Sequence, residues 1–211
     1  MDSIISNYVG TMSKYQNFLD KHTYEKDTKI TGYCPVIDTT VAMFLKVLID
    51  IKKPKRVLEL GTSIGYSTTV MAQSLSKYGG KITTIEFDKD IAVEAKLNFE
   101  KYRVSHIINV INADATKILP SLTEKFDMIF LDLYNEVYLS VLDYCVDLLD
   151  DNGLLIADDT LFPVAKNRSI FKMSNKYLHK FNVEISKRED LNSVLIPLDD
   201  GITLIVKNND I

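Results

Sequence analysis

The sequence predicts an α/β protein built on an open, mostly parallel sheet. Five short apolar or β-branched runs alternate with segments of helical length and composition, which is typical of βαβ units with helices on both faces of a sheet. Two further runs, 183–189 and 201–208, are joined by a connection too short for a crossover helix, so we expect them to pair antiparallel. The five earlier runs are residues 56–60, 81–87, 107–112, 126–133 and 153–158.

Two helical segments are predicted before the first strand. Apolar residues recur at helical spacing in residues 4–19, and a break at residues 32–35 leads into a second predicted helix at residues 38–51. We therefore expect a single domain of 211 residues, with N-terminal helices in residues 1–50 and a core in residues 55–211.

The composition is that of an ordinary globular protein, with 46% hydrophobic and 26% charged residues. No run of 18 apolar residues occurs, and the N-terminus lacks a basic segment followed by an apolar one, so we expect a cytoplasmic protein without a membrane segment. Cys34 and Cys145 stand far apart and are expected to be reduced thiols. The net charge of -4 argues weakly against a general nucleic-acid binder.

The ends of the first three strands carry candidate ligand-binding residues, because open parallel sheets bind ligands at the carboxyl ends of their strands. In ELGTSIGYS, Gly61 lets the chain pass close to a ligand, and the following helix N-terminus offers N–H groups to a carboxylate or phosphate. Ser63 stands where dinucleotide-binding loops have their middle glycine, which disfavours NAD. Glu86 can accept hydrogen bonds from both ribose hydroxyls, and Asp114 and Ala115 are placed for an adenine edge.

The next two strands end in carboxylates. Asp132 ends the fourth strand, and the adjacent Asp158 and Asp159 end the fifth, in the stretch LLIADDTLFP. Two neighbouring carboxylates at a strand end either sit in water or face a cation. Any one acidic residue could be a helix cap or a turn residue, but acidic residues at the ends of successive parallel strands are expected to face one crevice, which favours a binding site.

The sequence resembles the cation-dependent O-methyltransferases that include the catechol and caffeoyl-CoA enzymes, and it would be a small member of the bacterial type. The resemblance rests on RVLELGTSIGYST, ITTIEFD, INADA, FDMIFLD, GLLIADDTLF and LNSVLIPLDDGITLIVK, in this order, and runs from about residue 32 to the C-terminus. It implies a Rossmann-like, seven-stranded, mostly parallel sheet with a reversed last strand. It also implies S-adenosylmethionine (SAM) as methyl donor, a divalent cation, usually magnesium, and commonly a homodimer.

The resemblance assigns cofactor contacts to residues at several strand ends. Glu59 and Gly61 would line the methionine part of SAM, and Ser67 would meet its carboxylate at the helix N-terminus. Glu86 would hold the ribose. The full set of expected cofactor-binding residues is Glu59, Gly61, Ser67, Glu86, Asp114, Ala115 and Asp132.

The resemblance also assigns a metal site, with two departures from the family pattern. Asp132 and Asp158 match two metal ligands, and Asp159 stands where the third ligand is usually asparagine. Asn135 replaces the lysine that helps to remove the proton in the catechol enzymes, and Tyr134 replaces an acidic residue of the plant-type branch. We expect Asp132, Asn135 and Asp159 to be the catalytic residues. Asp159 could be a ligand only, one of the carboxylates could stay protonated, or Asp159 could accept the proton of the substrate.

Three functions fit this sequence. The first is SAM- and metal-dependent methylation of a hydroxyl on a small vicinal-dihydroxy molecule. The second is methylation of a hydroxylated tRNA nucleoside, which would use a basic stripe on a predicted helix at residues 166–181; an amphipathic surface helix is the favoured interpretation of that stripe. The third is a non-catalytic SAM-binding protein, suggested by the missing lysine. The stripe consists of Arg168, Lys172, Lys176 and Lys180.

Overall fold

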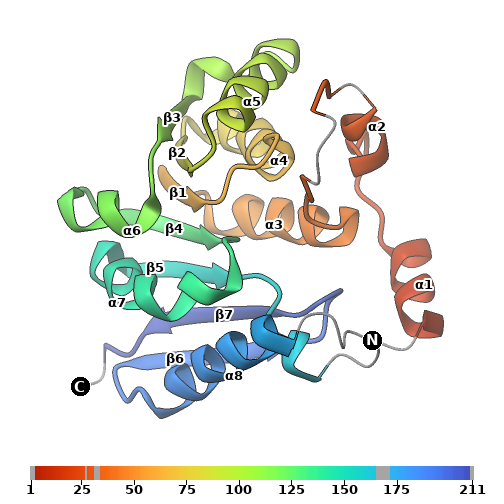
Figure 1. Ribbon diagram of the computed structural model, residues 1–211. Helices are drawn as coiled ribbons and strands as arrows, with labels where there is room; N and C mark the ends of the chain where they lie inside the picture. Colours follow the sequence, from red (N-terminus) through yellow and green to blue (C-terminus); the bar gives the residue numbers. More distant parts are fainter. Residues whose placement is uncertain (1–2, 27, 31–33, 165–171, 210–211) are drawn as a thin grey trace. The chain divides into compact units, whose positions relative to one another are not determined.

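The computed structural model describes residues 3–26, 28–30, 34–164 and 172–209 (Figure 1). The chain divides into two compact units, an N-terminal unit of residues 2–114 and a C-terminal unit of residues 115–211. Within the described ranges, no helix is long and apolar enough to cross a membrane.

The sheet of the N-terminal unit has three parallel strands in the order β3-β2-β1. Its strands are β1 (Arg56–Leu60), β2 (Lys81–Glu86) and β3 (Ile108–Asn112). Three longer helices belong to the same unit, and α4 and α5 contact the strands while α3 contacts α4. These helices are α3 (Thr39–Lys52), α4 (Tyr66–Leu75) and α5 (Lys89–Lys101). Aspartates cap α3 and α5, because the side chains of Asp38 and Asp88 accept hydrogen bonds from the first backbone N–H groups of those helices.

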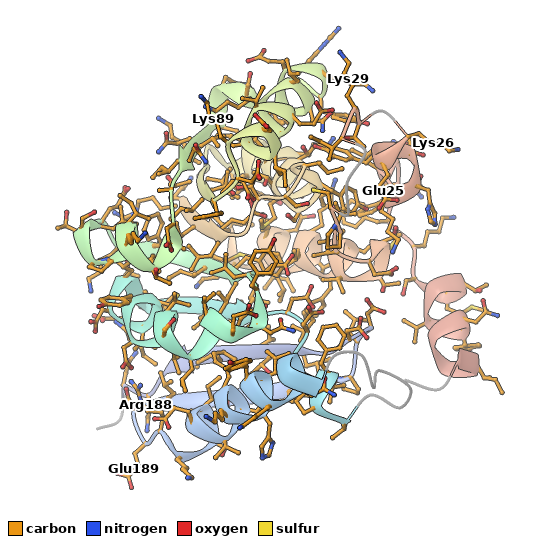
Figure 2. The ribbon with its side chains drawn as sticks, viewed as in Figure 1. Glu25, Lys26, Lys29, Lys89, Arg188 and Glu189 are labelled. Atoms are coloured by element: carbon orange, nitrogen blue, oxygen red, sulfur yellow. The ribbon has the colours of Figure 1, made fainter. Side chains whose placement is uncertain are left out.

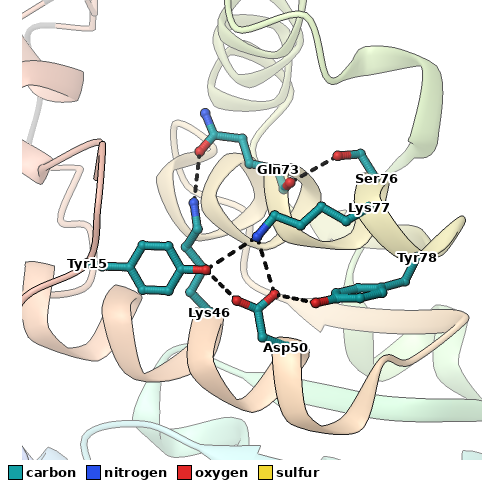
Figure 3. Close-up of polar contacts among 7 residues, drawn as sticks. All are labelled: Tyr15, Lys46, Asp50, Gln73, Ser76, Lys77 and Tyr78. Carbon is teal, nitrogen blue, oxygen red and sulfur yellow. Dashed lines mark hydrogen bonds and ion pairs between the residues drawn. The ribbon is translucent and has the colours of Figure 1, made fainter.

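The expected N-terminal helix is shorter than its apolar spacing suggests. It comprises α1 (Ser3–Met12), and a second short helix, α2 (Lys21–Glu25), follows an irregular stretch. In that stretch the Tyr15 hydroxyl donates a hydrogen bond to Asp50 (Figure 3). The Tyr15 and Phe18 rings lie 4.9 and 5.6 Å from the Lys46 ammonium. Asn17, between these two residues in the sequence, has φ 54°, in the left-handed region, so the helix does not continue through this stretch.

The C-terminal unit contains the reversed strand. β4 and β5 are parallel, β5 pairs antiparallel with β7, and β7 pairs antiparallel with β6. The strands are β4 (Phe126–Leu131), β5 (Leu149–Ala157), β6 (Leu191–Ile196) and β7 (Ile202–Lys207). The helices are α6 (Ala115–Ile118), α7 (Tyr138–Leu148) and α8 (Lys172–Lys187), with short 3-10 turns η4 (Asn135–Val137) and η5 (Phe162–Val164). The seven strands are ordered β3-β2-β1-β4-β5-β7-β6, which confirms the predicted fold class.

One strand was misplaced in the prediction. Residues 183–187 form the last turns of α8, and the strand that pairs with β7 is β6, which lies in the predicted connection. Leu178, Phe181 and Ile185 are buried at spacings of three and four residues, so the helical period of α8 continues through the predicted strand. The antiparallel pairing of the last two strands is confirmed with this corrected partner.

Two ion pairs of Arg188 hold the C-terminal end of α8. Arg188 follows the helix (Figure 2), and its guanidinium contacts the carboxylates of Asp143 and Asp190, each at 2.6 Å. Asp143 lies on α7 and Asp190 directly precedes β6. The paired guanidinium therefore links α7 to the turn at which the chain passes from α8 into β6.

Candidate active site

The loop after β1 has backbone conformations that require glycine. Gly61 has φ 98° and Gly65 has φ 90°, and Gly65 directly precedes α4. A Cβ atom at Gly65 would lie 2.4 Å from a ring carbon of Phe99, so a larger residue does not fit. Because glycine has no capping oxygen, the first N–H groups of α4 are left to meet an anionic group of a ligand.

Glu59 is fully buried and joins the strands to this loop. Its carboxylate accepts hydrogen bonds from the hydroxyls of Ser67 and Thr84, each at 2.6 Å, and from the hydroxyl of Thr68. β1, β2 and α4 are thereby held together at one point. Since the Ser67 hydroxyl donates its hydrogen to Glu59, the backbone N–H of Ser67 is the group that remains to donate to a cofactor carboxylate.

Glu86 is half-buried at the end of β2, and both of its carboxylate oxygens are oriented by backbone donors. One oxygen accepts the N–H of Ser63 and the other accepts the N–H of Asp88, each at 2.9 Å. A carboxylate oxygen has two lone pairs, so each can accept a further hydrogen bond, for example from a ribose hydroxyl. The Cys34 thiol lies 3.0 Å from the Ser63 hydroxyl, a neighbour of the glycine loop that the sequence pattern did not indicate.

The third strand ends beside the second. The N–H of Ala113 donates to the carbonyl of Glu86 at 2.9 Å, which joins the two strand ends. Asp114 follows and is half-buried, and Ala115 is the buried first residue of α6. The structure therefore gathers Glu59, Gly61, Ser67, Glu86 and Asp114 at the strand ends of the N-terminal unit.

The three predicted metal ligands follow two neighbouring strands of the C-terminal unit. Asp132 comes directly after β4, and Asp158 and Asp159 come directly after β5. The N–H of Asp158 donates to the carbonyl of Leu131 at 3.0 Å, so the two strand ends lie together. Asp158 is buried, whereas Asp132 and Asp159 are half-buried. The N–H of Asp159 donates to the Asp158 carboxylate at 2.8 Å.

The surroundings of these carboxylates disfavour negative charge. Burial raises the pKa of Asp132 to about 7. Burial, followed by repulsion from Asp132 and Asp159, raises the pKa of Asp158 well above its usual range, and Asp199 adds to the repulsion. The hydroxyl of the buried Tyr138 donates to the Leu131 carbonyl at 3.2 Å. The three aspartates are therefore close enough to repel one another.

The carboxylates do not form a ready-made ligand cage. In the described part of the chain, no three His, Cys, Asp or Glu side chains are grouped so that they could hold a metal ion. The donor chemistry nevertheless suits a hard cation, because carboxylate oxygens are the ligands that Mg²⁺ prefers. The three carboxylates also follow two strand ends that lie together, because the N–H of Asp158 bonds the carbonyl of Leu131.

Asp159 has an unusual backbone conformation. Its φ is 61°, in the left-handed region, which asparagine and aspartate tolerate better than most other residues with a side chain. Exchange between aspartate and asparagine is therefore compatible with the backbone at this position, and the family asparagine would fit the same conformation. The sequence pattern alone gave no sign of this constraint.

The remaining candidates lie beside the acidic residues or on α8. Asn135 is half-buried at the start of η4, and Tyr134 is largely exposed. Lys176 and Lys180 are exposed and Phe181 is buried, as an amphipathic surface helix requires. Of the predicted helix at 166–181, residues 166–171, Arg168 among them, lie outside the described residues.

The strand order and the glycine loop define a Rossmann-like fold of the methyltransferase class. A sequence model of the family described as O-methyltransferase matches residues 10–208, and the chain belongs to that family. A catechol O-methyltransferase of Niastella koreensis is 34% identical over 122 residues, which cover 56% of this chain and 55% of that protein. The chain thus spans about half the length of that relative.

Other relatives match over more of their length. Caffeoyl-CoA O-methyltransferase 2 of Petunia hybrida is 27% identical, over 90% of this chain and 88% of that protein. The crystal structure of an SAH-bound methyltransferase of Podospora anserina superimposes with a TM-score of 0.85 at 23% identity, over 98% of this chain and 94% of that one. The latter likeness shows a shared fold.

Proposed function

We propose that this protein transfers a methyl group from SAM to a hydroxyl of a small vicinal-dihydroxy molecule and that the reaction depends on a divalent cation. Membership of the O-methyltransferase family supports the reaction class. The observation that carries the metal dependence is the acidic group of Asp132, Asp158 and Asp159, in which burial and mutual repulsion oppose ionisation. A bound cation would remove that opposition.

The N-terminal unit offers groups that match the parts of SAM. The uncapped N–H groups at the start of α4 would bind the carboxylate of the methionine part, with Ser67 contributing its backbone amide. Glu86, already oriented by two backbone donors, would accept the ribose hydroxyls. Asp114 and Ala115 would contact the adenine. Glu59 would act indirectly, by fixing the loop that contains Gly61.

The C-terminal unit offers groups for the substrate. Asp132, Asp158 and Asp159 would hold the cation, and all three offer the oxygen ligands that Mg²⁺ prefers. When bound, a divalent cation would lower the pKa of a substrate hydroxyl. Asn135 cannot take up a proton at neutral pH, but its amide can orient a hydroxyl by donating or accepting a hydrogen bond. Asp159 remains as the carboxylate that can accept the proton of the substrate.

The proposal is tested by isothermal titration of SAM into the purified protein, followed by turnover of a catechol with Mg²⁺ and with EDTA. We expect SAM to bind in both buffers and methylation to require Mg²⁺. Equal turnover in the two buffers would refute the metal dependence. SAM binding without turnover of any catechol would direct the search for a substrate to hydroxylated tRNA nucleosides.

A further inference from the structure

Thr160, which follows the acidic pair, is fully buried and is held by three different parts of the C-terminal unit. Its N–H donates to the carbonyl of Gly201 at 3.0 Å. Its hydroxyl accepts a hydrogen bond from the Thr203 hydroxyl at 3.0 Å, and its carbonyl accepts one from the side-chain amide of Asn182 at 2.7 Å. Every polar group of Thr160 is thus bonded, to the turn after β6, to β7 and to α8.

The backbone of Asp159 needs this kind of support. Its φ of 61° lies in a region that residues with a side chain seldom adopt, so a competing conformation becomes accessible when the flanking peptides are free. On one side, the peptide between Asp158 and Asp159 is held by the bond from the Asp159 N–H to the Asp158 carboxylate. On the other side, the peptide between Asp159 and Thr160 is fixed by the bonds from the Thr160 N–H to Gly201 and from the Phe162 N–H to the Asp159 carbonyl. The Asn182 amide fixes the next peptide, because it bonds the Thr160 carbonyl.

The turn after β6 fits closely against the same loop. The N–H of Leu161 donates to the carbonyl of Asp200 at 2.8 Å, next to the bond from Thr160 to Gly201. Gly201 has φ 97°, and a Cβ atom there would lie 2.5 Å from the backbone nitrogen of Leu161. Two consecutive peptides of the loop are therefore hydrogen-bonded to this turn, and Gly201 lies too close to the loop for a larger residue to fit.

We propose that Asn182 and Thr203 are positioning residues, which act through Thr160 to fix the direction of the Asp159 carboxylate and thereby set the affinity of the acidic group for a divalent cation. This inference rests on the proposed function, because it requires that Asp159 binds a divalent cation. The groups that orient ligands around a metal commonly control its affinity without touching it. Here the control passes through a backbone peptide.

Asn182 does more than fill space in the core. Its side-chain oxygen is buried and accepts no hydrogen bond from the residues that the structure describes. A leucine of similar volume would avoid the cost of burying that oxygen. Among the residues that the structure describes, the bond to the Thr160 carbonyl is the interaction for which the amide is required.

The test uses two variants with different risks to folding. Asn182→Leu removes the amide donor at similar volume, and Thr203→Val removes the hydroxyl at nearly identical shape. Asn208→Leu is the control, because it removes another side-chain amide bond, to the carbonyl of Glu189 at 2.9 Å. This bond does not involve the loop that contains Asp158, Asp159 and Thr160.

Two quantities are measured, the Kd for Mn²⁺ by isothermal titration with SAM present and the hydrogen exchange of the Thr160 and Leu161 amides. We expect the Mn²⁺ Kd of Asn182→Leu to rise about tenfold. Thr203→Val should show a smaller rise in the same direction, and the SAM Kd should change by less than about twofold in both variants. The two amides should exchange faster in both variants and at the original rate in Asn208→Leu.

The outcomes separate this inference from the proposed function. An unchanged Mn²⁺ Kd together with unchanged exchange in both variants would overturn the positioning role. If the unchanged protein binds no Mn²⁺, the proposed metal dependence fails, and the same result overturns the role in metal affinity, while the exchange rates still show whether Asn182 orders the loop. Should Asn182→Leu fail to fold, Thr203→Val provides the same test.

Discussion

The carboxylates of the two units have opposite surroundings. In the N-terminal unit, Glu59 accepts three hydroxyl hydrogen bonds and Glu86 accepts two from backbone N–H groups. In the C-terminal unit, Asp158 accepts one backbone N–H and is repelled by Asp132 and Asp159. Both groups lie at or near the carboxyl ends of strands of the same sheet, so this position does not determine how many hydrogen bonds a carboxylate accepts.

The difference shows what each group of carboxylates can do. A buried carboxylate that accepts several hydrogen bonds is stable as an anion and is suited to holding structure or a neutral hydroxyl group. Buried carboxylates that repel one another are stabilised by protons or by a cation. The N-terminal unit thus offers fixed acceptors for a cofactor, and the C-terminal unit offers charge for an ion.

The largest effect should come from removing one member of the acidic group. Asp158→Ala deletes a carboxylate that would hold the cation, so we expect turnover with Mg²⁺ to fall at least about a hundredfold. The SAM Kd, measured by isothermal titration, should change less than about threefold because the expected SAM-binding groups lie at other strand ends. Undiminished turnover of Asp158→Ala would contradict the proposal that the carboxylates of the C-terminal unit bind a cation needed for the reaction.

Removing the buried carboxylate of the N-terminal unit should instead weaken folding. Glu59→Ala leaves three hydroxyls without their acceptor, and we expect the free energy of unfolding to fall by about 3 kcal/mol. Urea denaturation measures this loss. Glu86→Gln is the control, since Glu86 is half-buried and its replacement should weaken SAM binding more than stability. Equal stability of Glu59→Ala and the unchanged protein would contradict the structural role.

The pH dependence of stability should also distinguish the acidic group. The pKa of Asp132 is raised from 3.8 to about 7 in the folded protein, and that of Asp158 is raised as well. A raised folded-state pKa contributes stability below the unfolded value, near pH 4, and that contribution is lost as the pH rises through about 7.

We therefore expect the urea midpoint in EDTA to decline over this pH range more steeply in the unchanged protein than in Asp158→Asn. Mg²⁺ should reduce the decline in the unchanged protein, because the ion replaces the protons that the carboxylates lose. Parallel pH profiles for the two proteins would show that repulsion involving Asp158 does not affect stability.

The smallest effect is expected for Asp159→Asn. Asparagine tolerates the left-handed backbone and retains an oxygen ligand, so turnover should stay within about threefold if Asp159 serves only as a ligand. A loss of a hundredfold or more, measured at several pH values, would instead assign the acceptance of the substrate proton to Asp159. Turnover of Asp159→Ala should be lower than that of Asp159→Asn in either case, because alanine also lacks the ligand oxygen.

Much of the fold could be predicted from local patterns. The five parallel strands, the helix that became α3 and the antiparallel last pair all have clear periodicity or connection lengths. The strand predicted at 183–189 failed because β-branched and apolar residues there also fit the end of an amphipathic helix, and tertiary packing of Phe181 and Ile185 decided the outcome. The N-terminal helix ends at Met12, and the stretch beyond it contacts α3 through the bond from Tyr15 to Asp50, which joins distant parts of the sequence.

The candidate site could be predicted only in part from the sequence. The sequence pattern shows acidic residues at the ends of the predicted strands. The resemblance to a known family supplies the roles that we expect for them. The partners of Glu59 were missed because Thr84 meets it through strand register and Thr68 through the geometry of α4. The bonds from Thr160 to Asn182 and Thr203 were missed for the same reason, since they join residues 22 and 43 positions apart.

The central claim is that the acidic group binds a divalent cation, and titration of Mn²⁺ into the unchanged protein and into Asp158→Ala, followed by electron paramagnetic resonance, tests it most directly. We predict that the unchanged protein binds one ion per chain and that Asp158→Ala loses this site. Absence of binding to the unchanged protein, or equal binding to both, would contradict the account.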